Sequence, residues 1–187
     1  MPWRWCHTCG RYGATAFNKG NPHEAKDAAF QRRSYGCLCF CVNKNKPLVI
    51  CEGVATGLAI QQSGAGNTLC ALSSNNVTAV AQWVEKSGLA ESFPMVVIAT
   101  DHDIGRTAAG RLKSNAIPRA LEAAKLTGFA LAVPPATSQV GADARDLLGQ
   151  GGPQAVRDFM ASAAPAADVE KSRADIFLSM KEKSVDR

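Results

Sequence analysis

Three acidic residues stand directly after apolar stretches that have the length of β-strands. The stretch 48–51 runs into Glu52, and the stretch 95–100 runs into Asp101 and Asp103. In an open parallel α/β sheet, ligands bind at the carboxyl ends of the strands. If the two strands lie side by side, the three carboxylates converge there, and converging acids require a hard divalent cation such as Mg²⁺. The pattern therefore predicts metal-assisted phosphate chemistry.

A further acidic pair follows a later apolar stretch, 129–133. Asp143 and Asp146 are three residues apart, so they share a face if this part of the chain is helical. Asp143 could equally be the N-cap of a helix that carries Asp146. Both interpretations remain open from the spacing alone. His102, between the two central acids, is interpreted as a surface or supporting residue rather than a catalytic one.

The elements that must position these acids alternate between strands and helices from residue 47 onward. The apolar runs predict strands at 48–51, 68–72, 95–100 and 129–133. Helical spacing and cap residues predict helices at 54–63, from the Ser/Asn cluster 73–76 to about 87, at 106–125 and at 151–161. Pro118 is expected to kink or split the third of these helices. This alternation predicts an α/β fold with a parallel sheet and right-handed crossovers.

The chain divides into three parts by composition. Residues 1–46 form a cysteine-rich segment with little periodicity. Residues 47–160 contain the alternating strands and helices. In 161–187, an Ala/Pro-rich linker precedes a tail that can form an amphipathic helix.

The cysteines fall into two groups. Two of them lie inside apolar strand-like runs and are expected to be buried free thiols: Cys51 and Cys70. The other five are in the first 41 residues, where a Cys-x-x-Cys pair and a second cluster favour Zn²⁺ over disulfides in a reducing compartment: Cys6, Cys9, Cys37, Cys39 and Cys41. The second cluster is irregular, so a structural zinc module and a metal-free segment both remain open.

The composition is that of a soluble chain with a mildly basic surface. The 187 residues carry a net charge of +5 with a pI near 8.9, which is compatible with a polyanionic partner. No apolar stretch is long enough to span a membrane, and the charged N-terminus lacks an apolar signal core. A cytoplasmic protein is expected.

The order of these motifs resembles the Toprim domain of bacterial-type primases, topoisomerases, OLD nucleases and RecR. It is most similar to the Toprim of phage and plasmid primases and primase-helicases. That variety has a Glu-Gly-x-Ala-Thr start, as at 52–56, and a late Gly-x-Asp-x-x-Asp-Leu-Leu, as at 141–148. The resemblance covers about 47–160 and implies a compact four-stranded parallel sheet flanked by helices. Thr56 stands where some primases place another acid.

The resemblance also implies roles for the acids. Glu52 would be the general acid or base at a phosphate oxygen. Asp101 and Asp103 would coordinate Mg²⁺ or Mn²⁺. Asp143 or Asp146 would complete that metal site or form a second one.

The same resemblance implies phosphate contacts for two basic residues and a set of nucleic-acid partners. Arg106 and Lys113, predicted on the helix after the acids, would contact phosphates. The implied activity is primase-like, with Mg²⁺-dependent nucleotidyl transfer from NTPs making RNA primers on single-stranded DNA in phage, plasmid or mobile-element replication. A replicative helicase would act in cis or in trans.

Two other functions use the same residues. A Toprim nuclease would cleave phosphodiesters with these acids, and a non-catalytic module resembling RecR would bind DNA or assemble with partners. A topoisomerase also needs a nucleophilic tyrosine, and the tyrosines here, Tyr12 and Tyr35, lie outside the Toprim-like region.

Overall fold

The computed structural model describes residues 43–102, 116–135 and 142–172, together with the backbone of 15–16, 38–40, 105–106 and 112–113. The strands are β1 Thr15–Ala16, β2 Leu38–Phe40, β3 Leu48–Cys51, β4 Asn67–Cys70, β5 Val96–Ala99, β6 Gly105–Arg106, β7 Leu112–Lys113 and β8 Ala130–Ala132. The helices are α1 Val54–Gln62, α2 Ser74–Lys86, the 3₁₀ turn η1 Leu89–Ser92, α3 Ala116–Thr127 and α4 Ala144–Ala161.

The main sheet confirms the predicted four-stranded parallel core. Across the described residues its strand order is β1-β2-β4-β3-β5-β8. β4, β3, β5 and β8 run parallel to one another, whereas β1 and β2 are added to the β4 edge in antiparallel orientation. The cysteine-rich segment therefore contributes strands to the same sheet, which the sequence alone did not predict.

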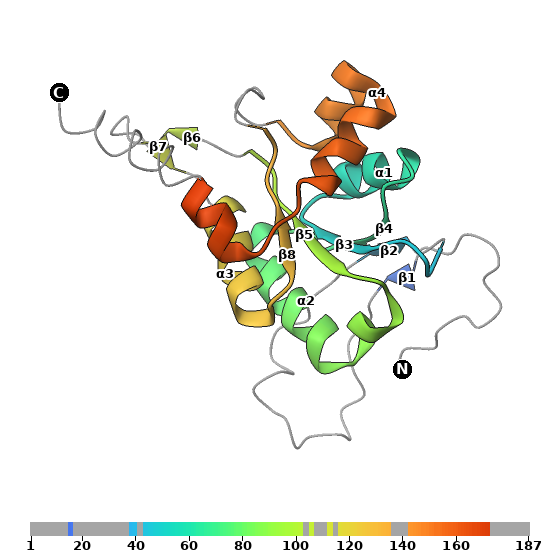
Figure 1. Cartoon of the computed structure of the whole chain (residues 1–187), viewed down its shortest axis with the longest axis vertical. Helices are drawn as coiled ribbons and strands as arrows, with labels where there is room; N and C mark the ends of the chain where they lie inside the picture. Colours follow the sequence, from blue (N-terminus) through green and yellow to red (C-terminus); the bar gives the residue numbers. More distant parts are fainter. Residues whose placement is uncertain are drawn as a thin grey trace.

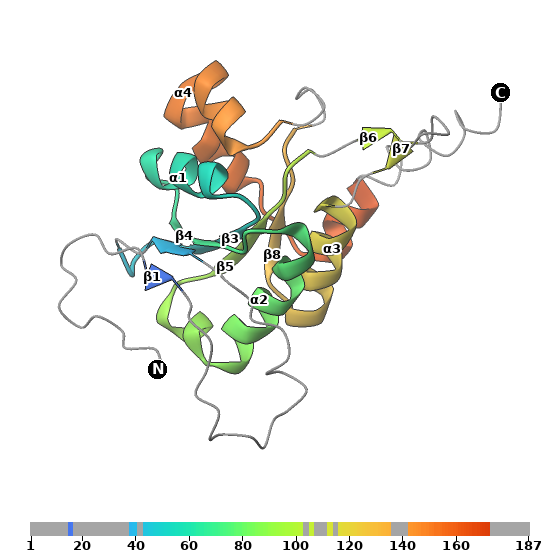
Figure 2. The same ribbon diagram turned by 180° about the vertical axis from the view of Figure 1, so that it is seen from behind.

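Helices cover both faces of this sheet, as in other α/β folds. Figures 1 and 2 show α1 and α4 together on one face and α2 and α3 on the other. Every residue of β3, β4 and β5 is buried, which explains why β3 and β5 are continuous apolar runs in the sequence. Ser73 caps α2 by accepting a hydrogen bond from the backbone N–H of Asn75, as the sequence predicted.

Helix α1 approaches the sheet closely at Gly57. A Cβ atom at this position would lie 2.4 Å from Cys70 Sγ, 3.3 Å from Cys51 Sγ and 3.4 Å from Thr68 Oγ1. The absence of a side chain therefore lets the first turns of α1 rest directly on β3 and β4. This contact fixes where α1 starts, next to the carboxyl ends of the parallel strands.

Thr68 offers a test of this packing. Its side chain is buried, and within the described part of the chain its Oγ1 has no hydrogen-bond partner. A buried hydroxyl without a partner is destabilising, so we expect Thr68→Val to raise the free energy of unfolding by about 1 kcal/mol. Urea denaturation of the two proteins measures the difference. A lower free energy of unfolding for the variant would show that the hydroxyl is satisfied.

The helix predicted for 106–125 is wrong in its first half. β6 and β7 pair in antiparallel orientation, and α3 begins only at Ala116, so Arg106 and Lys113 lie on paired strands rather than on a helix. Buried residues at helical spacing start at Ala116, whereas the preceding segment has no such apolar stripe. Pro118 causes no kink, because the N–H it lacks has no intrahelical partner in a first turn.

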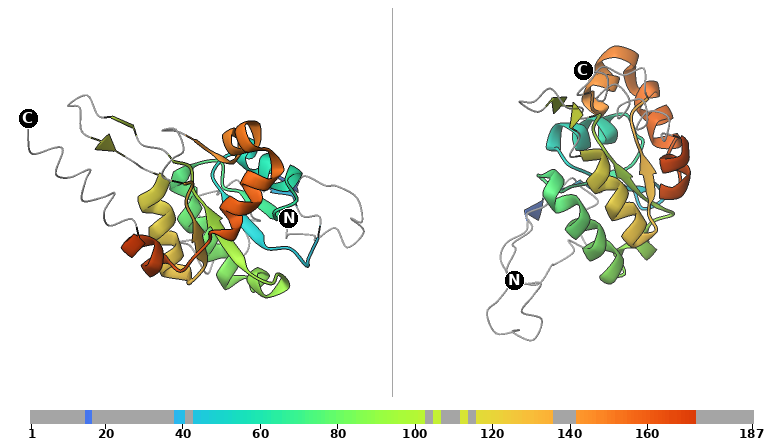
Figure 3. Two further views of the ribbon diagram at one scale, coloured as in Figure 1. Left: turned by 45° about the horizontal axis from the view of Figure 1, so that its top comes forward. Right: turned by 90° about the vertical axis from the view of Figure 1, so that its left-hand side faces the viewer.

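The helix predicted at 151–161 is the second half of a longer element. α4 starts at Ala144 and continues past Gly152, whose φ of 68° and following Pro153 produce a kink inside it. Beyond α4, Ala164 forms an antiparallel bridge with Leu131 of β8. Residues 166–172 are helical and lie beside α3 (Figure 3), with Val169 in the core and Lys125 paired with Glu170 at 2.7 Å.

Several sequence predictions fall outside the described residues. They concern the zinc ligands Cys6, Cys9, Cys37 and Cys41, and the side chain of Cys39. The predicted buried thiols are confirmed, since Cys51 and Cys70 are both free and buried. In the described part of the chain, none of the helices combines the length and apolarity that crossing a bilayer would need.

Candidate active site

The acids follow neighbouring strands at the point where the strand order reverses. β3 has β4 on one side and β5 on the other, and Cys51 of β3 is in register with Ala99 of β5. Glu52 comes directly after β3, and Asp101 comes two residues after β5. In open α/β sheets this reversal at the carboxyl ends of the strands forms the ligand-binding crevice.

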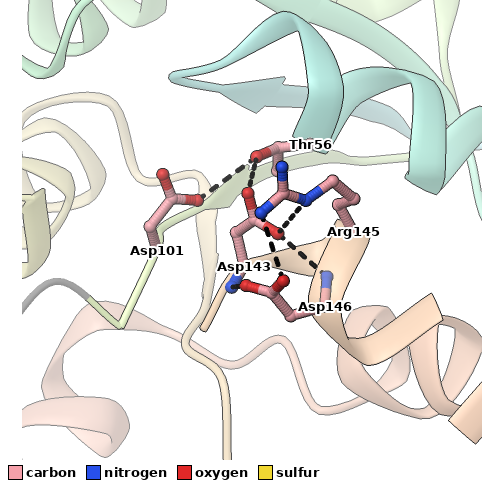
Figure 4. A network of polar contacts seen from close by, with 5 residues as sticks. All are labelled: Thr56, Asp101, Asp143, Arg145 and Asp146. Atoms are coloured by element: carbon pink, nitrogen blue, oxygen red, sulfur yellow. Dashed lines mark hydrogen bonds and ion pairs between the residues drawn. The ribbon is translucent and has the colours of Figure 1, made fainter. Parts of the chain in front are cut away.

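A threonine hydroxyl joins two of the carboxylates. Figure 4 shows Thr56 of α1 between Asp101 and Asp143, with Thr56 Oγ1 at 3.5 Å from Asp101 Oδ1 and 3.3 Å from Asp143 Oδ2. Thr56 is only 2% exposed, whereas both aspartates are partly accessible. The structure thus brings together residues that are 45 and 87 positions from Thr56 in the sequence.

A backbone hydrogen bond brings the two aspartate-bearing segments together. The N–H of His102 donates to the carbonyl of Ala142 at 2.9 Å, so the residue after Asp101 is fixed to the residue before Asp143. His102 itself is 5% exposed, so the interpretation as a surface residue is wrong and the supporting role remains. Asp103 lies outside the described residues, as do the side chains of Arg106 and Lys113.

Asp143 and Asp146 form a reciprocal cap at the start of α4. Asp143 Oδ1 accepts from the Asp146 N–H at 3.0 Å, and Asp146 Oδ2 accepts from the Asp143 N–H at 3.2 Å. The other oxygen of Asp146 pairs with Arg145 at 3.2 Å. Arg145 also lies 4.0 Å from Asp143 Oδ1, so both carboxylates share this guanidinium as well as the cap. The second oxygen of Asp143, Oδ2, contacts Thr56.

A pair of buried thiols lies beneath the two carboxylates. The Sγ atoms of Cys51 and Cys70 are 3.7 Å apart. The hydrogen bond with Cys70 and burial raise the pKa of the Cys51 thiol, and the negative charges of Asp101 and Asp143 raise it further. The same hydrogen bond lowers the pKa of Cys70. Cys51 consequently remains protonated and adds no negative charge next to the acids.

Glu52 lies at the same sheet edge but outside the Thr56 network. Among the described residues its side chain has no hydrogen bond or ion pair, and it is partly exposed. Its carbonyl accepts a 2.8 Å hydrogen bond from the N–H of Leu72, which has a φ of 63°. A left-handed leucine is strained, and such strain is concentrated at functional sites. Here the strained residue fixes the backbone that carries Glu52.

The two joined carboxylates suit a hard divalent cation. Mg²⁺ prefers oxygen ligands and is commonly held by one or two carboxylates, with the rest of its shell supplied by water and substrate phosphates. Asp101 and Asp143 provide such a pair at an accessible edge. Within the residues that the structure describes, no group of three or more His, Cys, Asp or Glu side chains could hold a metal, and Asp103 is not among those residues.

Comparison with known proteins identifies the family. The model of the Toprim domain family matches residues 47–154, which is more than half of the chain. The chain therefore belongs to the Toprim family. No curated protein sequence matches it.

Several primase domains are among the solved structures to which the chain is similar. The DnaG catalytic core is 25% identical, with 71% of this chain and 39% of that chain covered and a TM-score of 0.45. The RNA polymerase domain of Mycobacterium tuberculosis primase DnaG is 20% identical, with 71% and 43% covered and a TM-score of 0.45. The Aquifex aeolicus primase (zinc-binding and RNA polymerase domains) is 16% identical, with 78% and 34% covered and a TM-score of 0.47. The chain thus spans between 34% and 43% of the length of these structures.

Proposed function

We propose that this Toprim protein is primase-like and catalyses Mg²⁺-dependent nucleotidyl transfer from NTPs on single-stranded DNA in phage, plasmid or mobile-element replication. The observation that carries the proposal is the pair Asp101 and Asp143, joined through Thr56 at the carboxyl edge of the parallel sheet. Family membership supports a nucleic-acid substrate, and the basic pI favours a polyanionic partner.

The acids at the carboxyl ends of the parallel strands have different roles in this proposal. Asp101 and Asp143 hold the cation, with Asp103 as a further ligand, and Asp146 keeps Asp143 in place through the α4 cap. The bound cation supplies positive charge that stabilises the phosphate oxygens during transfer. Glu52, which is partly exposed beside them, accepts or donates a proton at the reacting oxygen.

A primer-synthesis assay with two substitutions tests the function. Labelled NTPs, single-stranded DNA and Mg²⁺ should give short RNA products with the unmodified protein. We expect Glu52→Gln to lower the rate at least about a hundredfold because the proton-transfer group is lost. Asp101→Asn should lower it similarly because the cation loses a charged ligand.

The same reactions are scored for strand cleavage, which separates the alternatives. Cleavage without synthesis would replace the primase proposal with a nuclease. DNA binding without either activity, and unchanged by both substitutions, would indicate a non-catalytic assembly module.

A further inference from the structure

Thr56 is placed where a single hydroxyl serves two carboxylates. Its Oγ1 lies 3.5 Å from Asp101 Oδ1 and 3.3 Å from Asp143 Oδ2, and these residues come from three different segments of the chain (Figure 4). A hydroxyl has one hydrogen to donate, so at any moment it can stabilise one carboxylate only. Thr56 therefore contacts both of two acids whose negative charges repel each other.

Both contacts of the Thr56 hydroxyl are long for hydrogen bonds. O–H···O hydrogen bonds are usually 2.7–2.8 Å long, and both contacts of Thr56 are longer than this. Thr56 therefore binds neither carboxylate tightly. Its contacts to both of them limit how close together or how far apart Asp101 and Asp143 can lie.

The position of Thr56 in the fold makes this spacer rigid. It is 2% exposed and lies in the first turn of α1, directly before Gly57, which rests against the thiols of β3 and β4. A β-branched side chain in a helix has restricted χ1 freedom. Packing of α1 on the sheet therefore fixes the Thr56 hydroxyl relative to both aspartates.

We propose that Thr56 is a positioning residue that sets the separation of Asp101 and Asp143 for a divalent cation, and thereby sets the affinity of the site for that cation. This inference rests on the cation site of the proposed function. It concerns a contact to the ligands rather than to substrate, so Thr56 is not itself a catalytic residue. Its effect is measurable on binding of the metal in the absence of DNA and NTPs.

The test is Mn²⁺ binding to the full chain, measured by calorimetry and by the electron paramagnetic resonance signal of free Mn²⁺. Thr56→Val has nearly the same shape but no hydroxyl, and we expect its Kd for Mn²⁺ to rise about tenfold or more, as found when groups that orient metal ligands are removed. Thr56→Ser keeps the hydroxyl, and its Kd should remain within about threefold of the unmodified protein.

Thr68→Val is the matched control. It makes the same chemical change at an equally buried threonine, on β4, whose hydroxyl has no partner within the described residues. Its Kd for Mn²⁺ should not change. Circular dichroism of each variant verifies that the fold is retained.

Three outcomes would overturn the inference: an unchanged Kd in Thr56→Val, a Kd for Thr56→Ser as weak as that of Thr56→Val, or no Mn²⁺ binding by the unmodified protein at millimolar concentrations. A Kd that depends on the Thr56 hydroxyl would uphold it even if no primers are made. In that case the proposed synthesis fails while the positioning role stands, so the two failures are distinguishable.

Discussion

Asp143→Asn should leave the protein folded but lower primer synthesis at least about a hundredfold. Asparagine is as good an N-cap as aspartate, so it can still accept from the Asp146 N–H and keep α4 in place. It lacks the negative charge that a bound cation requires, and loss of a charged ligand removes several kcal/mol of transition-state stabilisation. Primer synthesis and urea denaturation measure the two effects separately.

A second substitution at the same residue separates its two roles. Asp143→Ala loses the cap as well as the charge, so the free energy of unfolding should also fall by about 1 kcal/mol. Asp158→Asn removes a charge from an exposed part of the same helix and is expected to change neither quantity. Full activity in Asp143→Asn would show that this residue only caps α4 and that the cation is held elsewhere.

Gly57→Ala should lower the free energy of unfolding by about 1–3 kcal/mol, which corresponds to a Tm lower by about 2–12 °C. Alanine normally stabilises a helix relative to glycine, so this prediction reverses the usual sign. The reason is steric, since the new Cβ would lie 2.4 Å from Cys70 Sγ and would push α1 away from the sheet. Thermal unfolding followed by circular dichroism measures the change.

Two further proteins show whether the Cβ contact is the cause. Gly149→Ala places the same methyl group in α4, where nothing lies within 4 Å, and should stabilise the fold by about 0.5–1 kcal/mol. Gly57→Ala combined with Cys70→Ala removes the clashing sulfur, so the loss in the double variant should be smaller than the sum of the two single losses. Additive losses would contradict the steric explanation.

The parallel core of the fold could be predicted because its strands are buried on both faces. Most of them therefore appear in the sequence as short apolar runs, and alternation with helices predicts a parallel sheet. The antiparallel addition of β2 to β4 could not be predicted, because a three-residue strand carries no signal for its partner. The predicted start of α3 is too early because the sequence between residues 106 and 115 lacks breakers strong enough to exclude a helix.

The sequence predicts that acids gather at this sheet edge, but not the contacts that join Asp101 and Asp143. Carboxylates at strand ends are visible in the sequence, and the spacing of Asp143 and Asp146 allowed the cap that the structure shows. In the sequence, Thr56 is visible only as the end of the Glu-Gly-x-Ala-Thr motif and as a residue that stands where some primases have an acid. Its hydroxyl gains importance from two residues 45 and 87 positions away, and no local pattern encodes such a contact.

The bridge between Ala164 and Leu131 covers part of the outer edge of the parallel sheet. β8 is paired with β5 on one side, and on its other side Leu131 and Ala164 exchange backbone hydrogen bonds of 2.8 and 3.1 Å. An open strand edge is a template on which another chain can add, leading to aggregation or domain swapping. A protein cut at residue 154, where the family match ends, would keep Glu52, Asp101 and Asp143 yet expose that edge. We therefore expect a protein cut at residue 154 to aggregate more readily than the full chain, although the segment 155–172 contributes no acid to the described site.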